Sequence, residues 1–110
     1  MPLTGTYPKK LVSGRIEIPR RMRKILGSYP TASIQHEKGD KQSYPYLRLR
    51  PSVAKEPPAQ TVQLTDSQLR HVRVRTSDQV VIIGVNDRAE IWKPDMYATY
   101  EKEQRLATPA

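Results

Sequence analysis

Gly14 and Arg15 begin the segment of this chain whose side chains are best suited to binding a ligand. A glycine beside an arginine can hold a guanidinium at the tip of a tight turn. A guanidinium donates paired hydrogen bonds to phosphate or to the edge of guanine. Ile16 and Ile18 then alternate with Glu17, which is typical of a short strand with one buried face. We therefore expect Arg15 to be a DNA contact, with bracing of the turn through Glu17 as the alternative.

Further cations surround this segment and are candidate contacts to the phosphate backbone: Lys9, Lys10, Arg20, Arg21, Arg23 and Lys24. Contacts of this kind position a protein on a duplex without reading its sequence. Two other interpretations remain open for them. Each cation could lie on a solvated surface, and Arg23 and Lys24 could contact carboxylates of a neighbouring subunit.

The net charge of +8 is unevenly distributed along the chain. Residues 1–55 carry twelve Lys and Arg against three Asp and Glu, whereas residues 56–110 carry seven against eight. Such asymmetry indicates that one face meets a polyanion, most often nucleic acid. A basic surface that serves only solubility is the alternative.

Residue types that support catalysis or metal binding are scarce. The chain has no cysteine, and its two histidines are His36 and His71, which argues against a disulfide framework or a structural metal site. The five glycines are isolated, so no glycine-rich phosphate loop is present. Asp87 and Glu90 could be taken as a carboxylate pair, but a turn residue and a solvent-facing strand residue explain them better. We expect no enzymatic activity, no cofactor, no metal and no small-molecule substrate.

No apolar run approaches the ~20 residues needed to span a bilayer, and the N-terminus lacks the pattern of a secretory signal. We therefore expect a cytoplasmic, nucleoid-associated protein without a membrane partner.

The predicted elements occur twice in the same order, strand, helix, strand, turn and strand, after an edge strand at 6–12. The first copy comprises a strand at 16–18, a helix at 20–26 and strands at 32–36 and 46–50. The second copy comprises a strand at 61–64, a helix opened by Thr65-x-x-Gln68, and strands at 80–85 and 89–92. Pro19 suits the first position of the first helix and Gly27 its C-cap, whereas Thr65 and Gln68 fit a capping box. A helix over residues 94–106 follows. Similar hairpins in any small β-rich domain are the alternative to a true duplication.

Motifs in both halves resemble the MraZ family, and more broadly the AbrB/SpoVT superfamily of swapped-hairpin DNA-binding proteins. The motifs are Gly5-x-Tyr7, Gly14-Arg15-Ile16-x-Ile18-Pro19-x-x-Met22-Arg23, Tyr46-Leu47-Arg48-Leu49-Arg50-Pro51, Val80-Val81-Ile82-Ile83-Gly84-Val85 and Ala89-Glu90-Ile91-Trp92. The resemblance implies a mainly β fold with short helices. Two AbrB-like repeats would form a pseudo-twofold swapped-hairpin barrel, followed by a C-terminal helix.

The resemblance also implies a sequence-specific transcriptional regulator that binds short repeated promoter boxes in double-stranded DNA. Members of the family often assemble into rings, so we expect a homo-oligomer. The first repeat (1–55) would contact DNA. The second, degenerate repeat with the C-terminal helix (56–110) would serve packing and assembly, and both would form one compact domain.

Two departures from the family pattern concern the predicted DNA contacts. The family usually has an acidic residue and a lysine before Gly-Arg, whereas residues 9–13 here read Lys-Lys-Leu-Val-Ser and make the turn one residue shorter. The second repeat has Gln60-Thr61 in place of Gly-Arg. The contacts are therefore expected from the first repeat alone.

Two other functions fit parts of the sequence. An AbrB-type antitoxin would bind a toxin through its C-terminal segment, and a non-catalytic structural protein would use the basic half to associate with nucleic acid. Trp92 is expected in the chain's own core, although Trp92 and Tyr97 could instead lie at a subunit interface.

Overall fold

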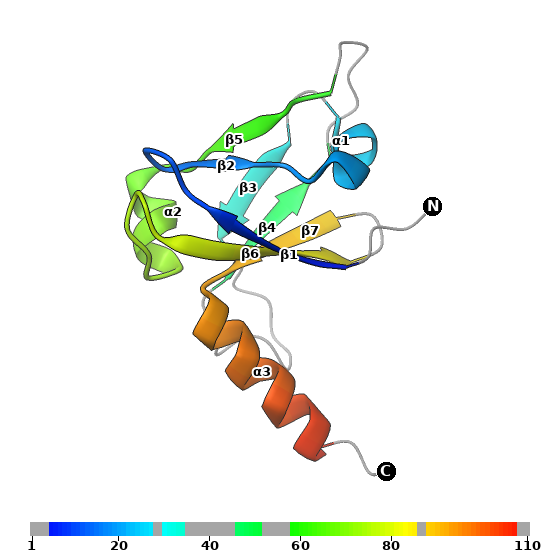
Figure 1. Cartoon of the computed structure of the whole chain (residues 1–110), viewed down its shortest axis with the longest axis vertical. Helices are drawn as coiled ribbons and strands as arrows, with labels where there is room; N and C mark the ends of the chain where they lie inside the picture. The colour runs from blue at the N-terminus through cyan, green and yellow to red at the C-terminus, as the bar shows by residue number, and fades with distance from the viewer. Residues whose placement is uncertain (1–4, 28–29, 35–45, 52–57, 86–87, 108–110) are drawn as a thin grey trace.

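The computed structural model describes residues 5–27, 30–34, 46–51, 58–85 and 88–107 (Figure 1). In chain order the elements are β1 (Thr6–Lys10), β2 (Arg15–Glu17), α1 (Arg20–Leu26), β3 (Thr31–Ile34), β4 (Tyr46–Arg50), β5 (Thr61–Gln63), α2 (Asp66–His71), β6 (Gln79–Val85), β7 (Arg88–Trp92) and α3 (Pro94–Ala107). The turns expected between the paired strands, at 38–41 and 86–87, lie outside these residues, and so does His36. The protein is thus mainly β with three short helices, as the sequence predicted.

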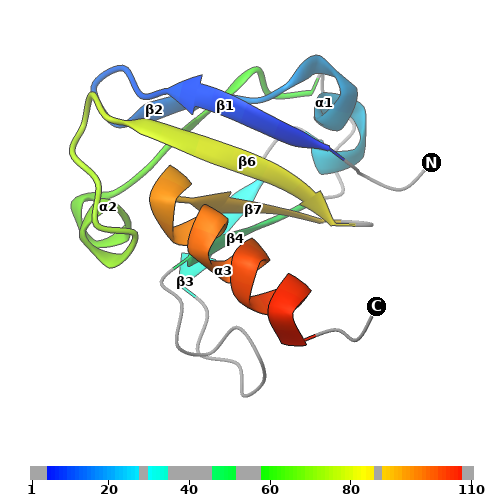
Figure 2. The ribbon, with the colours of Figure 1, turned by 60° about the horizontal axis from the view of Figure 1, so that its bottom comes forward.

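The strands form two separate antiparallel sheets. The larger sheet has the strand order β1-β6-β7-β4-β3, and β2 pairs with β5 in a second, two-stranded sheet. Figure 2 shows β2 lying alongside β1, over the large sheet. The predicted swapped-hairpin barrel is thus not a closed one in the described strands, because β1 and β3 end the large sheet at opposite edges and β2 and β5 pair only with each other.

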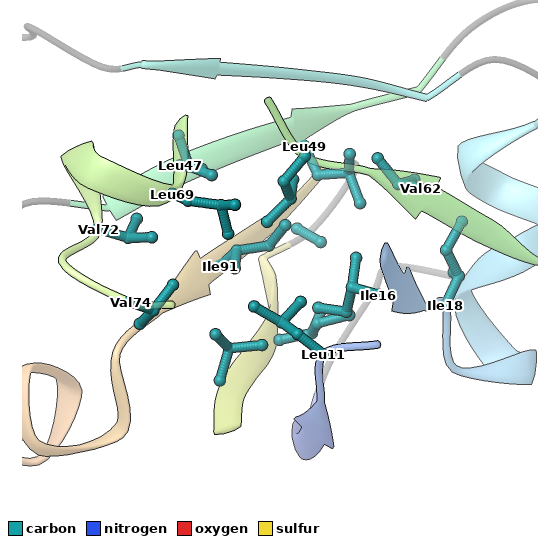
Figure 3. Packing of buried hydrophobic residues seen from close by; sticks show 14 of the residues in the cluster. Leu11, Ile16, Ile18, Leu47, Leu49, Val62, Leu69, Val72, Val74 and Ile91 are labelled. Atoms are coloured by element: carbon teal, nitrogen blue, oxygen red, sulfur yellow. The ribbon is translucent and has the colours of Figure 1, made fainter. Parts of the chain in front are cut away.

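The main hydrophobic core fills the space between the two sheets (Figure 3). Ile16 of β2 and Val62 of β5 meet Leu47, Leu49 and Ile91 of the large sheet there. These are alternate residues of their strands, as the period-two pattern requires. Removing their apolar surface from water is the main stabilising contribution to the fold. Met22 and Leu26 of α1 close one end of the core, while Leu69 of α2 and the C-cap residue Val72 close the other.

A second apolar cluster lies on the opposite face of the large sheet, under α3. Its buried members are Tyr46, Val81, Ile83 and Trp92, and Met96, Tyr97 and Tyr100 of α3 pack against them. Trp92 is completely buried and stacks on Tyr46 with ring centroids 4.9 Å apart. The prediction that Trp92 belongs to the chain's own core is confirmed.

Glu90 corrects one expectation of the sequence analysis. It was predicted to face solvent, but its side chain is 1% exposed, and its Oε1 accepts a hydrogen bond of 3.1 Å from Nε1 of Trp92. The reason is that α3 covers the face of β7 opposite the main core. Both faces of this strand are therefore buried, and alternation along the sequence does not distinguish them.

The helix ends follow their sequence signals closely. Thr65 and Gln68 form the predicted capping box: Thr65 Oγ1 accepts from the Gln68 N–H at 3.2 Å, and Gln68 Oε1 accepts from the Thr65 N–H at 2.9 Å. Gly27 caps α1 with φ of 79°. Pro19 is the N-cap of α1 and not its first helical residue, since its ψ of 138° is extended. In the part of the chain described, no helix is both long and apolar enough to cross a membrane.

Candidate nucleic-acid interface

A two-residue turn, Ser13-Gly14, joins β1 to β2, and Arg15 follows it directly as the first residue of β2. Val12 and Arg15 exchange both backbone hydrogen bonds, each 3.0 Å long. Ser13 and Gly14 between them have φ of 52° and 76°. Positive φ at both central residues is the signature of a type I′ turn, whose twist matches that of paired strands. The segment ahead of Arg15 is therefore a tight β-turn.

Hydrogen bonds hold this turn on both sides. The N–H groups of Leu11 and Gly14 donate to the carbonyls of Asp78 and Thr76, each at 2.9 Å, in the loop between α2 and β6. On the other side, the Leu64 N–H donates to the Gly14 carbonyl at 2.9 Å. Nε2 of Gln63 donates to the Ser13 carbonyl at 3.0 Å. The backbone of the turn is thus fixed against two other segments of the chain.

Arg15 lies exposed beside this turn. It lines a surface hollow of about 350 Å³ together with Lys9, Lys10, Val12, Glu17 and Thr61. Within the described residues the Arg15 guanidinium has neither a hydrogen-bond acceptor nor a carboxylate partner. Its side chain is therefore available to an external anion. Three of the predicted site residues, Lys9, Lys10 and Arg15, come together here.

Glu17 pairs with Lys9 and not with Arg15. Nζ of Lys9 donates to Oε1 of Glu17 at 2.9 Å. This hydrogen bond, together with the charge of Lys9, holds the pKa of the Glu17 carboxyl below its ordinary value of 4.5, and the charges of Arg23 and Arg20 lower it further. Lys9, and not Arg15, therefore makes the contact with Glu17 that was the alternative role of Arg15. The carboxylate of Glu17 neutralises the charge of Lys9 in the hollow.

The four predicted cations of α1 form a separate group. This helix lies at the far end of β2 from the turn (Figures 1 and 2). Arg20, Arg21 and Lys24 are exposed, whereas Arg23 is half-buried and its Nε donates to the Ile18 carbonyl at 2.9 Å. Part of the hydrogen-bonding capacity of Arg23 therefore serves the fold. The other three cations are free to extend a basic surface away from the turn.

Sequence reasoning missed a second basic segment beside the turn. Arg73 and Arg75 are exposed and lie in the loop from α2 to β6, whose Thr76 carbonyl accepts from the Gly14 N–H. Figure 1 shows this loop at the same end of the molecule as the turn. The net charge of the second half concealed these residues, because eight carboxylates offset its seven Lys and Arg. One of them, Asp78, lies in the same loop, where its Oδ2 accepts from the Arg75 N–H at 2.9 Å. The spacing of Arg70, Arg73 and Arg75 is the signal that could have identified them.

The fold and this site together define a small, mainly β protein with a rigid, cationic turn at one end. No protein-family model matches the chain. The chain is 31% identical to the transcriptional regulator MraZ of Bifidobacterium longum (strain NCC 2705), over an alignment of 129 positions that covers 93% of this chain and 85% of the relative. The chain therefore belongs to the MraZ family, as its motifs predicted.

Proposed function

We propose that this protein is a transcriptional regulator that binds short repeated promoter boxes in double-stranded DNA as a homo-oligomer, and that it catalyses no reaction. The observation that carries this proposal is the rigid type I′ turn with an exposed arginine that has no partner within the described residues. A turn whose backbone is fixed in this way loses little backbone conformational entropy on binding. The family relationship supports the same function, since the relative is named a transcriptional regulator.

Arg15 is the residue proposed to read sequence. A guanidinium can donate two hydrogen bonds to O6 and N7 of guanine, and the major groove is wide enough to admit a two-stranded β-ribbon. Lys9, Lys10 and the exposed arginines of the α2–β6 loop would contact phosphates on either side. The cations of α1 would lengthen this track along the backbone.

Hydrogen bonds around β2 and β5 support a pseudo-twofold arrangement of two repeats, residues 1–55 and 56–110. The Ile18 N–H donates to the Gln60 carbonyl, and the Leu64 N–H donates to the Gly14 carbonyl, both at 2.9 Å, at opposite ends of the β2–β5 pair. This reciprocity supports an equivalence between Gln60 and Gly14 in the two proposed repeats. Because β1 pairs with β6, and β4 with β7, each repeat supplies strands to the other. A swapped-hairpin architecture has this property.

The asymmetry of the two repeats bears on assembly. Thr61 stands opposite Glu17 in the β2–β5 pair, at the place that Arg15 holds in the first repeat. Among the described residues, one subunit then offers one arginine-bearing turn for reading bases, so it makes few sequence-specific contacts. Several linked subunits on adjacent boxes gain affinity through effective concentration, and this is the reason we propose an oligomer.

The antitoxin alternative receives less support. An antitoxin of this type would present its C-terminal segment to a toxin. Here Met96, Tyr97 and Tyr100 of α3 pack against the chain's own sheet. The apolar side chains of α3 therefore pack within this chain and are not presented to a toxin.

A salt series with two DNA duplexes tests the proposal. The full chain is titrated onto the DNA upstream of its own gene and onto a shuffled duplex of equal composition, from about 50 to 200 mM salt. We expect both affinities to fall and the preference for the upstream DNA to persist, since base contacts depend less on salt than phosphate contacts do. Equal affinity for both duplexes throughout would contradict the proposal and favour a non-specific structural protein. Comparing transcripts with and without the protein then shows whether it represses or activates.

A further inference from the structure

Val12 is an apolar side chain in a cationic setting. It is 70% exposed and is the one large hydrophobic side chain so exposed among the described residues. Single exposed apolar residues are common on protein surfaces. This one, however, lines the same hollow as Lys9, Lys10 and Arg15 and begins the rigid turn.

The turn fixes the position of Val12 relative to Arg15. The two residues exchange both backbone hydrogen bonds, so they form a directly opposed pair. The Cα atoms of such a pair are about 5.5 Å apart, and their side chains project from the same face of the ribbon. Stacked bases of a DNA strand are about 3.4 Å apart along the axis. A ribbon that brings Arg15 to one base pair therefore brings Val12 to a neighbouring one.

The surroundings of Val12 restrict the chemistry of its partner. Lys10 and Arg15 carry positive charge without a carboxylate partner in the described part of the chain, which disfavours an apolar protein surface as the ligand. The partner must be a polyanion that also displays a small apolar group. The C5-methyl of thymine is such a group, and it projects into the major groove.

We infer that Val12 reads the C5-methyl of a thymine next to the base pair that Arg15 contacts. The inference rests on the proposed DNA-binding function and adds a specificity-determining residue to it. A β-branched side chain suits this role because its χ1 is restricted. The contact also distinguishes DNA from RNA, since uracil lacks the methyl group.

Replacing thymine by deoxyuridine tests this inference directly. A high-affinity duplex is first selected from random DNA with the full chain, and each thymine is then replaced in turn. Deoxyuridine keeps the base-pairing edge and the minor groove and removes only the methyl group. We expect one position to lose about fourfold in affinity, the equivalent of one buried methyl group. That position should adjoin the guanine whose preference is lost in Arg15→Ala.

Variants separate this contact from other effects. Val12→Ala should bind the thymine and deoxyuridine duplexes with equal affinity. Lys10→Ala, the matched control in the same hollow, should weaken binding to both and leave their ratio unchanged. Thermal unfolding of Val12→Ala checks the fold, and the deoxyuridine comparison with the unaltered protein does not depend on any variant.

Three results would overturn the inference. If the protein binds a specific sequence but no thymine replacement weakens it, the methyl contact is absent while the proposed function stands. If Val12→Ala weakens both duplexes equally, Val12 acts as a minor-groove wedge or a subunit contact. If no duplex is preferred over shuffled DNA, the inference and the proposed function both fail.

Discussion

At the scale of single residues, the cations of the hollow differ in what they face. Arg15 has no partner among the described residues, whereas Lys9 already holds Glu17 at 2.9 Å. Lys9 must give up this carboxylate before it can bind a phosphate. If Lys9 contacts DNA as proposed, Glu17 competes with the phosphate for this cation, and the lowered pKa of Glu17 keeps it ionised as the pH falls toward the ordinary carboxyl range.

Glu17→Gln should strengthen DNA binding of every sequence. The change frees Lys9 for a phosphate, so the slope of log affinity against log salt should steepen by about 0.9. Glu103→Gln on the exposed side of α3 is the matched control and should leave the slope unchanged. Fluorescence anisotropy at several salt concentrations measures both variants. An unchanged slope in Glu17→Gln would show that Lys9 does not contact DNA.

At the scale of elements, the turn before β2 depends on Gly14. Its φ is 76°, and a Cβ added there would lie 2.9 Å from Nε2 of Gln63. Gly14→Ala should therefore lower the free energy of unfolding by about 1–3 kcal/mol, since it combines left-handed strain with a close contact. Denaturant unfolding measures this loss. An Ala variant as stable as the parent would contradict the rigid turn.

The C-terminus of α2 permits the opposite test. Arg73, just after the helix, has a positive φ of 62°. The Val74 N–H donates to the Leu69 carbonyl, and the Arg73 N–H donates to the Arg70 carbonyl. This is a Schellman motif with arginine where glycine is usual. Arg73→Gly should raise the free energy of unfolding by about 0.5–1 kcal/mol. The same variant should lower the salt slope of DNA binding by about 0.9. Lower stability would refute the strain argument, and an unchanged slope would remove Arg73 from the interface.

Local signals predicted most of these elements, and tertiary contacts account for what was missed. The capping box at Thr65 and the glycine cap of α1 involve neighbours in sequence, so they are visible in the chain itself. The partner of Glu17 and the engagement of Arg23 with the Ile18 carbonyl depend on how strands and helix meet. Burial of Glu90 likewise depends on where α3 docks. The arginine at the turn was predicted. The spacing of Arg73 and Arg75 marked a basic segment, but only the fold places that segment beside the turn.

At the scale of the whole molecule, α3 is joined to the sheet through aromatic contacts. Trp92 meets Tyr97 with ring centroids 5.3 Å apart and Tyr100 at 5.2 Å. Burial, more than the nearby charges of Glu101 and Glu90, raises the pKa of the Tyr97 phenol above its ordinary value of 10.0. The folded state thus favours the neutral form of this phenol.

Alkaline pH should loosen this contact. A group whose pKa is raised by folding contributes stability that is fully present below its pKa in the unfolded chain. This contribution is lost as the pH rises through its pKa in the folded protein. The free energy of unfolding should therefore fall above about pH 10. Urea unfolding followed by Trp92 fluorescence measures it, since Trp92 is the sole tryptophan. Tyr97→Phe should remove part of this pH dependence. If the free energy of unfolding of the variant falls with pH as steeply as that of the parent, Tyr97 does not contribute to the pH dependence.

One exposed arginine beside a rigid turn is proposed to read DNA. The most direct measurement is the ratio of affinities for upstream and shuffled DNA in Arg15→Ala. Lys102→Ala, at an exposed position of α3, is the control because it removes the same charge. We expect a ratio near one for Arg15→Ala, an unchanged ratio for Lys102→Ala, and parental unfolding curves for both. An Arg15→Ala protein that still prefers the upstream DNA as strongly as the parent would show that Arg15 does not read the sequence.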